Sequence, residues 1–386
     1  MVDLKFKHLH EELNKARVPV GEYQNDNQFL CEADYLLRPH QHEGQVITYG
    51  FVSVENLKNV QNFTLVSSEE IAIDKARSLA DGKNIFVVVE ANQYSGLLIL
   101  SQPLETEYSL VSFQKSLSGI VGITDSNGIT RFFSKNGIAI HELRNWRTKP
   151  NISSTARIIQ RSASMINYQD LCKILEFCFY SLSANKTGAT IVWFLREPNA
   201  TILAAAKPQI DTQSLQMNLL ASQNLYALQS ILERNDGAAL MSPDGEVFGV
   251  GAHLQQSEKS IQLIQPYSGT RHTSARRFSY DCAESIIFTV SSDGPVSIFS
   301  DGLKVTELYI DTNIIAESYR SLSSDRNVVV EDSWEVICPK CGKTSIVNEI
   351  FIYGWRERET EECPLCNTQI AASKCYQLIA HLVKKI

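Results

Sequence analysis

Two Cys-x-x-Cys pairs near the end of the chain constrain its folding more than any other feature. They are Cys338-Pro339-Lys340-Cys341 and Cys363-Pro364-Leu365-Cys366. Each pair places two thiols on one tight turn, so both sulfurs can reach the same ion. Four thiolate ligands favour a closed tetrahedral Zn²⁺ site with a structural role, because no position is left open for a substrate water. An iron site with the same ligands stays open as an alternative.

The module around these cysteines, residues 334–386, is predicted to be a zinc ribbon. The 21 residues between the two pairs are enough for a β-hairpin. Apolar residues at helical spacing then predict a C-terminal helix, and they are Cys375, Leu378, Ile379, Leu382 and Val383. Such a small module buries little core, so metal binding is expected to supply its folding energy.

Composition narrows the class of protein. The chain has 386 residues, which is long for one domain, and its 44% hydrophobic and 20% charged residues are typical of a globular protein. The formal net charge of −7 argues against a general nucleic-acid binder, and against nucleic acid as the expected partner. No apolar run approaches the roughly 18 residues of a membrane span, and no signal peptide is visible. Nine cysteines, four of them in metal-type pairs, favour a cytoplasmic protein that makes no membrane contact.

Three regions differ in sequence pattern. Residues 1–155 alternate between helical and strand patterns, as do residues 160–315, which predicts two α/β domains before the ribbon at 334–386. The expected helices lie at 4–13, 69–79, 168–182, 215–234 and 270–283. The expected strands lie at 46–52, 85–90, 96–100, 122–129, 131–141, 190–195, 201–205, 238–241, 247–251, 285–290 and 295–299.

The middle region carries two motifs about thirty residues apart, and the first is Asp236-Gly237-Ala238. It lies between a predicted helix and a predicted strand. Asp236 can bind a divalent metal or accept a proton from a hydroxyl, while Gly237 and Ala238 leave room for a bulky ligand. A lone Asp-Gly-Ala is most often only a turn, so a functional interpretation needs the second motif.

The second motif is Gly269-Thr270-Arg271-His272-Thr273-Ser274-Ala275, at a loop-to-helix junction. Gly269 lets the backbone approach a ligand closely, and Thr270 offers a hydroxyl and an expected N-cap. The free amides and the dipole of the helix start favour an anion. Arg271 adds a guanidinium suited to phosphate, and His272 adds a further donor.

Together, in this order and with this strand pattern, the motifs resemble the diadenylate cyclase (DAC) domain family. The match covers about residues 165–310, including the Asp236 motif, Gly251-Ala252-His253-Leu254, the Gly269 motif and the closing segment 290–297. The resemblance implies a twisted mixed sheet flanked by helices. It also implies a nucleotidyltransferase that joins two ATP molecules into cyclic di-AMP with Mg²⁺ or Mn²⁺ and releases two pyrophosphates. The family reacts two ATPs between two facing DAC domains, so a homodimer or higher homo-oligomer is expected.

Carried onto this chain, the resemblance implies a role for each matching residue. Asp236 would bind or activate the 3′-hydroxyl and help hold the catalytic Mg²⁺ or Mn²⁺, and the catalytic residues Arg271 and His272 would cradle the triphosphate together with Thr270. The nucleotide-binding residues that it implies are Gly237, Ala238, Leu254, Gly269, Thr270, Thr273 and Ser291. Residues 1–155 would fill the place of the sensor-like domain that precedes the DAC domain in some members. The sensor and the ribbon would then regulate when two DAC domains meet.

Two positions depart from the family pattern. The family's second motif usually ends Arg-His-Arg, and here the third position is Thr273, so a phosphate contact is lost or is taken over by Arg276 or Arg277. The acidic pair near the closing turn is replaced by Ser291-Ser292-Asp293. An active cyclase is the favoured interpretation. The alternatives are a weak or inactive sensor that binds ATP or a cyclic dinucleotide, and a nucleic-acid-scanning protein with the ribbon as its reader.

Overall fold

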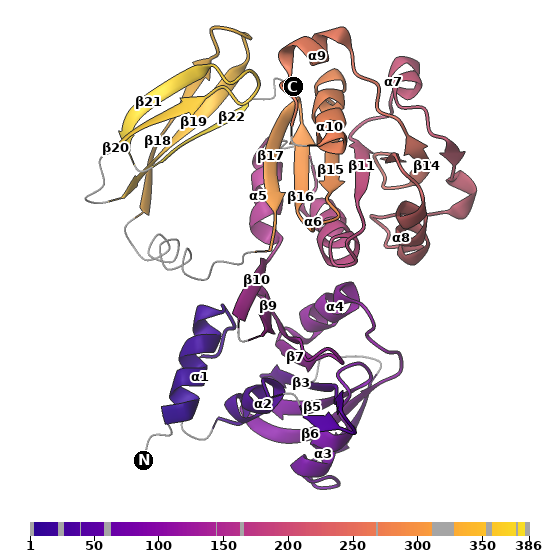
Figure 1. The fold of residues 1–386 in the computed structure, drawn as a ribbon, viewed down its shortest axis with the longest axis vertical. Coiled ribbons are helices and arrows are strands. Elements are labelled where there is room, and N and C mark those ends of the chain that lie inside the picture. Colours follow the sequence, from indigo (N-terminus) through magenta and orange to yellow (C-terminus); the bar gives the residue numbers. More distant parts are fainter. Residues whose placement is uncertain are drawn as a thin grey trace. The chain divides into compact units, whose positions relative to one another are not determined.

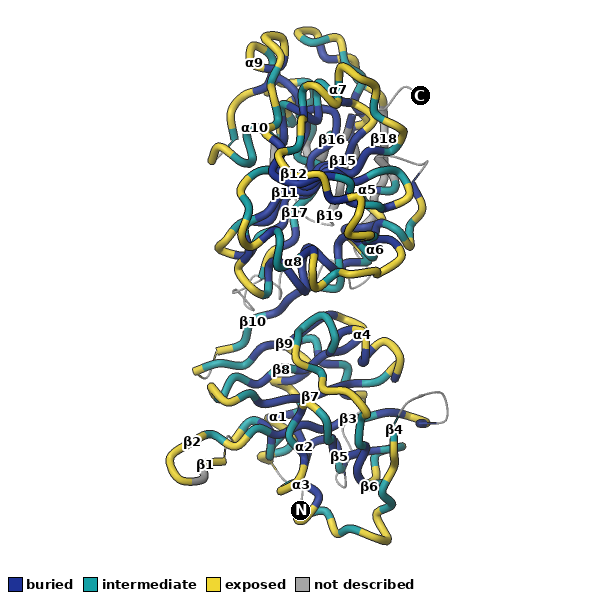
Figure 2. The backbone as a smooth tube through the Cα atoms, turned by 90° about the vertical axis from the view of Figure 1, so that its right-hand side faces the viewer, coloured by how far each residue is buried: buried dark blue, intermediate teal, exposed yellow. Residues whose placement is uncertain are grey.

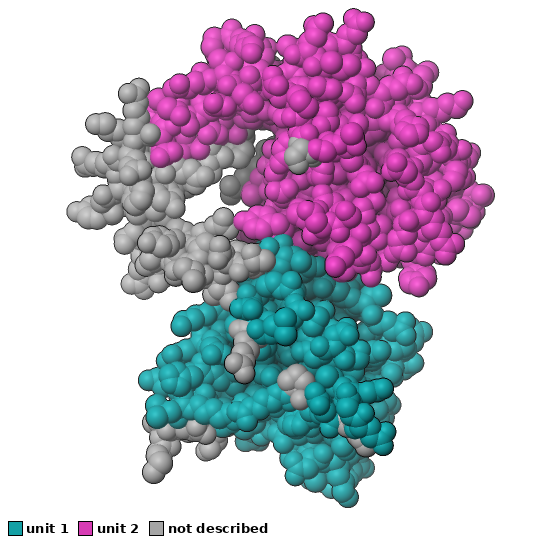
Figure 3. Space-filling model, in the orientation of Figure 1, with its two compact units in different colours: residues 1–151, 310–314 teal, residues 152–309, 315–386 magenta. Residues whose placement is uncertain are grey.

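The computed structural model describes residues 4–21, 27–38, 40–57, 63–143, 145–162, 166–267, 269–310, 328–352, 357–375 and 377–382. The chain forms two compact units (Figure 3), one of residues 1–151 and 310–314 and one of residues 152–309 and 315–386. The first boundary lies close to the one expected at 155. The cysteine-rich segment, residues 328–382 with both cysteine pairs, is part of the second unit.

Unit 1 is an eight-stranded sheet with helices on both faces (Figure 1). Its strand order is β10-β9-β8-β7-β3-β5-β6-β4, in which only β3 and β5 run parallel. The helices are α1 (Leu4–Lys15), α2 (Gln28–Leu36), α3 (Ile73–Leu79) and α4 (Glu107–Leu117). The strands are β3 (Tyr49–Val54), β4 (Phe63–Ser67), β5 (Ile85–Glu90), β6 (Gln93–Leu100), β7 (Ile120–Thr124), β8 (Thr130–Ser134), β9 (Gly137–Glu142) and β10 (Asn145–Pro150), with a separate pair β1 (Gln41–His42) and β2 (Gln45–Val46).

The core of unit 1 lies on both faces of this sheet. Leu13 of α1 and Ala76 of α3 are fully buried in one cluster with Phe51 of β3. On the other face, the ring of Phe113 in α4 lies 5.5 Å from the ring of Phe86 in β5. The central strands β3, β5, β7, β8 and β9 are therefore buried along most of their length (Figure 2), as expected for a sheet covered on both sides.

A buried ion pair joins α2 to α3 in this unit. The Glu32 side chain is fully buried, and Arg77 Nη2 donates to its Oε1 at 2.7 Å. The Tyr49 hydroxyl donates to Oε2 of the same carboxylate at 2.5 Å, and the Gln28 amide donates to Oε1 at 2.5 Å. A buried charge is tolerated only when it is paired and hydrogen-bonded, so this network fixes the packing of α2 against the sheet.

Unit 2 is built around a seven-stranded mixed sheet with the order β12-β14-β13-β11-β15-β16-β17. Its strands are β11 (Ala189–Phe194), β12 (Ile210–Asp211), β13 (Ala238–Met241), β14 (Val247–Ala252), β15 (Ser285–Val290), β16 (Val296–Ser300) and β17 (Leu303–Leu308). Its helices are α5 (Ser153–Ser162), α6 (Tyr168–Glu176), the π-helix η1 (Phe177–Leu182), α7 (Ala200–Ala205), the 3₁₀-helix η2 (Gln213–Leu215), α8 (Leu225–Arg234), α9 (Glu258–Leu263) and α10 (Thr270–Asp281).

Helix α10 covers one face of the unit 2 sheet (Figure 1). Its Ala275 and Phe278 are fully buried in a cluster with Val192 of β11 and Ile287 of β15. Side chains alternate along a strand, so the neighbouring residue Ile191 is buried on the opposite face. Packing against the sheet thus fixes the position of α10, whose first residues carry the second motif.

Two segments of unit 2 differ from the sequence-based expectation. Residues 201–205 were expected as a strand but belong to helix α7, because the Asn199 side chain accepts a hydrogen bond from the Ile202 amide and caps the helix. The helix expected from residue 215 begins only at Leu225. Three residues between 216 and 224 have positive φ angles, which interrupt a helix.

The cysteine-rich segment is entirely β-structure in the described residues. Strands β18 (Val328–Ile337), β19 (Thr344–Ile352) and β22 (Gln377–Leu382) form one sheet, and β20 (Glu357–Glu362) pairs with β21 (Gln369–Cys375). The hairpin expected between the cysteine pairs is wrong, because β19 and β20 pair with different strands.

The expected C-terminal helix is wrong as well. Residues 377–382 form a strand, and Leu378 and Leu382 are buried at even spacing on one side of it. The side chains of Cys375 and Ile379 and the residue Val383 lie outside the described part of the chain. In the described residues, no helix is long and apolar enough to cross a membrane.

We expect the buried ion pair of unit 1 to carry measurable stability. Arg77→Met should destabilise the fold by about 3 kcal/mol, because it leaves the Glu32 carboxylate buried without its partner. Urea unfolding of the full chain would measure the loss. The matched control is Arg38→Met, since Arg38 is 63% exposed and pairs with Asp34 at the surface; it should cost less than about 1 kcal/mol. Equal effects of the two substitutions would contradict the prediction.

Candidate functional site

Neighbouring strands of unit 2 bring Asp236 of the first motif and Ser291 of the closing segment to one edge of the sheet. β11 and β13 run parallel, with Thr190 level with Ala238. β15 runs antiparallel to β11 and ends at Val290. Asp236, two residues before Ala238, and Ser291, directly after Val290, therefore lie at the same edge. The sequence motifs alone did not show this proximity, since it depends on strand order.

Asp236 and Arg271 meet at this edge. Arg271 Nη2 lies 3.3 Å from Asp236 Oδ1, and the two side chains are 39% and 86% exposed. The Gly237 amide and the Arg271 guanidinium lower the pKa of Asp236 below its usual range, so this carboxyl is ionised at neutral pH. The structure thus joins the first motif to the second, and it leaves the carboxylate open to solvent.

His272 lies next to Arg271 and contacts the closing turn. Its Nε2 is 3.4 Å from Ser291 Oγ, and its ring packs 6.0 Å from the ring of Phe299. Burial lowers the pKa of His272; the Glu307 carboxylate opposes this, and the positive charges of Lys304 and Arg271 add to it. The ring is therefore largely neutral at pH 7, with one nitrogen that donates and one that accepts.

Gly237 and Ala238 have structural reasons to be small. Gly237 has φ of +100°, and a Cβ there would lie 2.6 Å from the backbone carbon of Gly251. Ala238 is buried in the core beneath α10, and Leu254 is partly buried against the same core. Their nucleotide contacts stay predictions, because backbone and core packing already account for these residue types.

The start of α10 is built differently from the expectation. Gly269, with φ of +88°, is the N-cap, and Thr270 is the first helical residue, so the expected Thr270 cap is wrong. The Thr273 hydroxyl accepts a hydrogen bond from the Tyr267 amide at 3.1 Å and lies 2.9 Å from the Gly269 carbonyl oxygen. Thr273 therefore holds the loop that precedes the helix, in the position where the resembling family carries arginine.

Neither Arg276 nor Arg277 can take over the phosphate contact from where it lies. Arg276 is buried and donates to the carbonyl oxygens of Gly302 at 2.8 Å and Pro364 at 3.1 Å. Arg277 donates to the Ile264 carbonyl at 3.2 Å and to the Gln256 side chain. Both guanidinium groups hold backbone and loop, so that part of the expectation is wrong.

A polar cluster beside His272 was missed by the sequence analysis. Lys304 Nζ donates to the Tyr267 hydroxyl at 2.7 Å and to Glu307 at 2.8 Å. Ser297 donates to the same carboxylate at 2.7 Å, and the Tyr267 ring lies 5.6 Å from the His272 ring. Lys304 and Glu307 belong to strand β17, after the last motif, and only sheet pairing could have placed them here.

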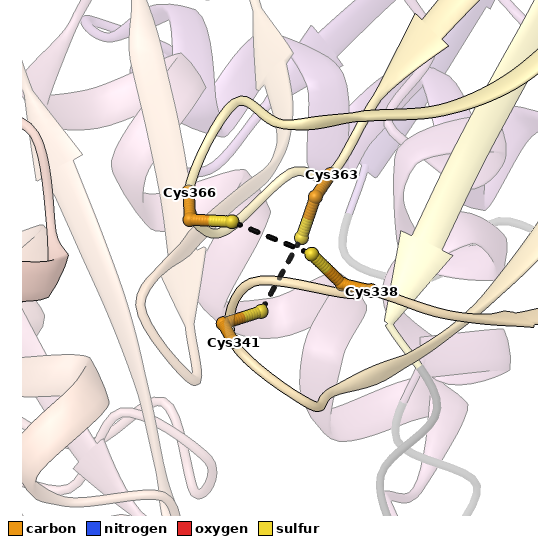
Figure 4. A group of neighbouring side chains, drawn as sticks. All are labelled: Cys338, Cys341, Cys363 and Cys366. Atoms are coloured by element: carbon orange, nitrogen blue, oxygen red, sulfur yellow. Dashed lines mark hydrogen bonds between the residues drawn. The ribbon is translucent and has the colours of Figure 1, made fainter.

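The four cysteines of the two pairs converge on one point (Figure 4). Their sulfurs all lie within 4.8 Å of one another, with Cys338 Sγ 3.5 Å from Cys366 Sγ and Cys341 Sγ 3.6 Å from Cys363 Sγ. A tetrahedral ion with Zn–S bonds of about 2.3 Å separates its sulfurs by roughly 3.8 Å. The group can therefore hold one metal ion, and its donor chemistry suits zinc.

The second cysteine turn packs against the motif-bearing part of unit 2. Leu365, inside that turn, is buried in one cluster with Ile264 and Leu303. The neighbouring Pro364 carbonyl accepts from Arg276, and Lys343 lies 3.6 Å from Asp301. The second cysteine turn, whose geometry a metal would fix, thus contacts the loop before the second motif and helix α10, which begins in that motif.

Two family models match separate parts of this chain. Residues 8–150 match the family model described as "Probable sensor domain DACNK", and residues 177–303 match the DAC model, described as "DisA bacterial checkpoint controller nucleotide-binding". A solved structure of a DacA double mutant from Staphylococcus aureus is 18% identical and covers 45% of this chain and 96% of that chain, with a TM-score of 0.26. No curated protein matches the chain.

We expect the purified protein to contain one zinc ion per chain, as measured by elemental mass spectrometry. Cys363→Ser should abolish the stoichiometric zinc and expose residues 328–382 to protease, because metal binding supplies most of the folding energy of such modules. The matched control is Cys31→Ser, a partly buried cysteine of unit 1, which should keep its zinc. A metal-free protein with an intact, protease-resistant segment would contradict the prediction.

Proposed function

We propose that this chain, a member of the DAC-domain family with an N-terminal sensor domain, condenses two ATP molecules into cyclic di-AMP. One observation carries the proposal. The exposed carboxylate of Asp236 lies 3.3 Å from the guanidinium of Arg271, at the start of a helix and beside His272. A nucleotide needs such a set, with a base or metal ligand next to anion donors.

The start of α10 supplies the anion-binding half of the site. Its first amides have no intrahelical partner, and the dipole of this 12-residue helix favours negative charge there. Arg271 adds a planar fork that suits phosphate oxygens. Its pairing with Asp236 is largely exposed, and such pairs contribute at most about 1 kcal/mol. A triphosphate can therefore draw Arg271 away from Asp236 with little loss.

Asp236 supplies the other half. It is ionised and 86% exposed, so it can hold a Mg²⁺ or Mn²⁺ ion together with the substrate phosphates. In the described residues, the only group of three or more possible metal ligands is the four cysteines, which fits an ion held mainly by its substrate. When bound, such an ion would neutralise triphosphate charge. Asp236 would also accept a hydrogen bond from the attacking 3′-hydroxyl.

The reaction balances without another reactant. The 3′-oxygen of one ATP forms a bond to the α-phosphorus of the other and gives up its proton to solvent. The bond from that phosphorus to the β-phosphate bridge breaks, and pyrophosphate leaves. The same step in the opposite direction closes the ring and releases the second pyrophosphate. Two sites must face each other, so we propose that two copies of the chain associate through their DAC domains.

The flanking parts would act on this association. We propose that the sensor domain and the cysteine-rich segment set when two DAC domains meet. Free thiols persist in a reducing compartment, so the cytoplasm is the proposed location.

One observation favours a second candidate, a weak or inactive sensor of ATP or a cyclic dinucleotide. Thr273 holds a loop where the family has arginine, and Arg276 and Arg277 do not replace it.

We expect purified full-length protein with ATP and Mn²⁺ to release cyclic di-AMP, detected by mass spectrometry. Asp236→Asn and Arg271→Ala should each lower turnover by about 10²–10³-fold, the usual loss when one group that stabilises a transition state is removed. Asp244→Asn, a matched carboxylate in the β13–β14 turn, should leave turnover unchanged. Specific activity should also rise with protein concentration if two chains form the site.

The same preparation separates the two candidates. ATP binding by calorimetry without any product, in a protein shown to be dimeric, would select the sensor. A protein that does not turn over ATP and binds neither ATP nor cyclic di-AMP would refute both candidates.

A further inference from the structure

Gly188 lies directly beneath the guanidinium of Arg271. A Cβ at this glycine would be 2.5 Å from Arg271 Nη1 and 3.5 Å from its Cζ. Real Cβ atoms essentially never approach a heavy atom that closely, so any side chain at position 188 would displace the guanidinium. Gly188 belongs to neither sequence motif and lies immediately before β11.

The strand register explains this contact. Parallel pairing sets Thr190 level with Ala238, and the same register two residues earlier sets Gly188 level with Asp236. Antiparallel pairing sets Ala189 opposite Val290, which brings Gly188 opposite the next residue of that chain segment, Ser291. Gly188 is therefore the middle of a row whose ends are the carboxylate that pairs with Arg271 and the hydroxyl that contacts His272.

The contact with Arg271, and not the backbone conformation, is what favours a glycine here. The φ angle of Gly188 lies outside the left-handed region, so any residue could adopt its backbone conformation. The three heavy atoms nearest to the added Cβ all belong to the Arg271 guanidinium. Gly237 is the contrast, because its φ of +100° and the backbone of Gly251 exclude a side chain whatever the ligand.

We propose that Gly188 is a positioning residue that seats Arg271 over the sheet edge, within reach of both Asp236 and the ATP triphosphate. The ion pair with Asp236 is too exposed to hold the guanidinium by itself. Because Gly188 has no side chain, the guanidinium can pack directly against the backbone at this edge of the sheet. This inference rests on the proposed function and names the residue that sets the geometry of its phosphate contact.

The test is Gly188→Ala in the full-length protein. Thermal stability should stay the same or rise slightly, because the backbone conformation suits alanine and the displaced group is the end of a flexible side chain. kcat/KM for ATP should fall by up to about 10²-fold, the order expected when a contacting group moves by about 1 Å. Gly188→Ser should show a similar loss.

A double-mutant cycle separates positioning from a general structural effect. The dissociation constant for ATP, measured by calorimetry, should rise on Gly188→Ala in the parent protein. In the Arg271→Ala background the same substitution should change it less than about 2-fold, because no guanidinium remains to be displaced. An undiminished effect in that background would show that Gly188 acts by another route and would overturn the inference.

Two further results would be decisive. A Gly188→Ala protein with the parent's kcat/KM and ATP affinity would overturn the inference and leave the proposed function standing. A parent protein that neither binds nor turns over ATP would overturn the proposed function, and this inference with it. If the parent binds ATP without turnover, the cycle on the dissociation constant still decides the role of Gly188.

Discussion

The candidate site depends on one constraint, the pairing of β11 with β13 on one side and β15 on the other. Because β11 runs parallel to β13 and antiparallel to β15, the start of two strands and the end of the third lie at one sheet edge. That edge carries Asp236 and Ser291, and α10 begins above it. Asp236, Gly188 and Ser291 lie in one row at this edge. A shift of one residue in either register would turn that row to the other face of the sheet and separate the Asp236 carboxylate from the Arg271 guanidinium.

Helix α10 serves two purposes along its length. Its first turn presents Arg271 and His272, which are partly exposed and contact the sheet edge. Its second turn carries Arg276, which is buried and donates to the carbonyl oxygens of three separate segments, at Gly302, Gln265 and Pro364. A buried cation held by neutral acceptors has a lowered pKa, as found for Arg276, and its hydrogen bonds are costly to lose. The same helix therefore leaves the side chains of its first turn partly exposed and holds its second turn in the core.

Local signals in the sequence predicted most of what is local in the structure. The cysteine spacing predicted a convergent four-thiol group, and the strand patterns at 238–241 and 247–251 predicted β13 and β14. Capping and strand pairing were not visible, so residues 201–205 and 377–382 were assigned to the wrong element type. In the site, the motifs predicted Asp236, Arg271 and His272. The motifs did not identify Gly188 or Lys304, because strand register alone brings these two residues to the site and no short motif encodes register.

The cysteine-rich segment gains a role from its position against α10. The second cysteine turn is buried against Ile264 and Leu303. A bound metal ion would fix the conformation of that turn, which contacts Arg276 and the loop before α10 through backbone and apolar atoms. The departure at Thr273 fits the same picture, since its hydroxyl holds the other end of that loop. The second cysteine turn and the Thr273 hydroxyl thus order the two ends of the loop that leads into the second motif.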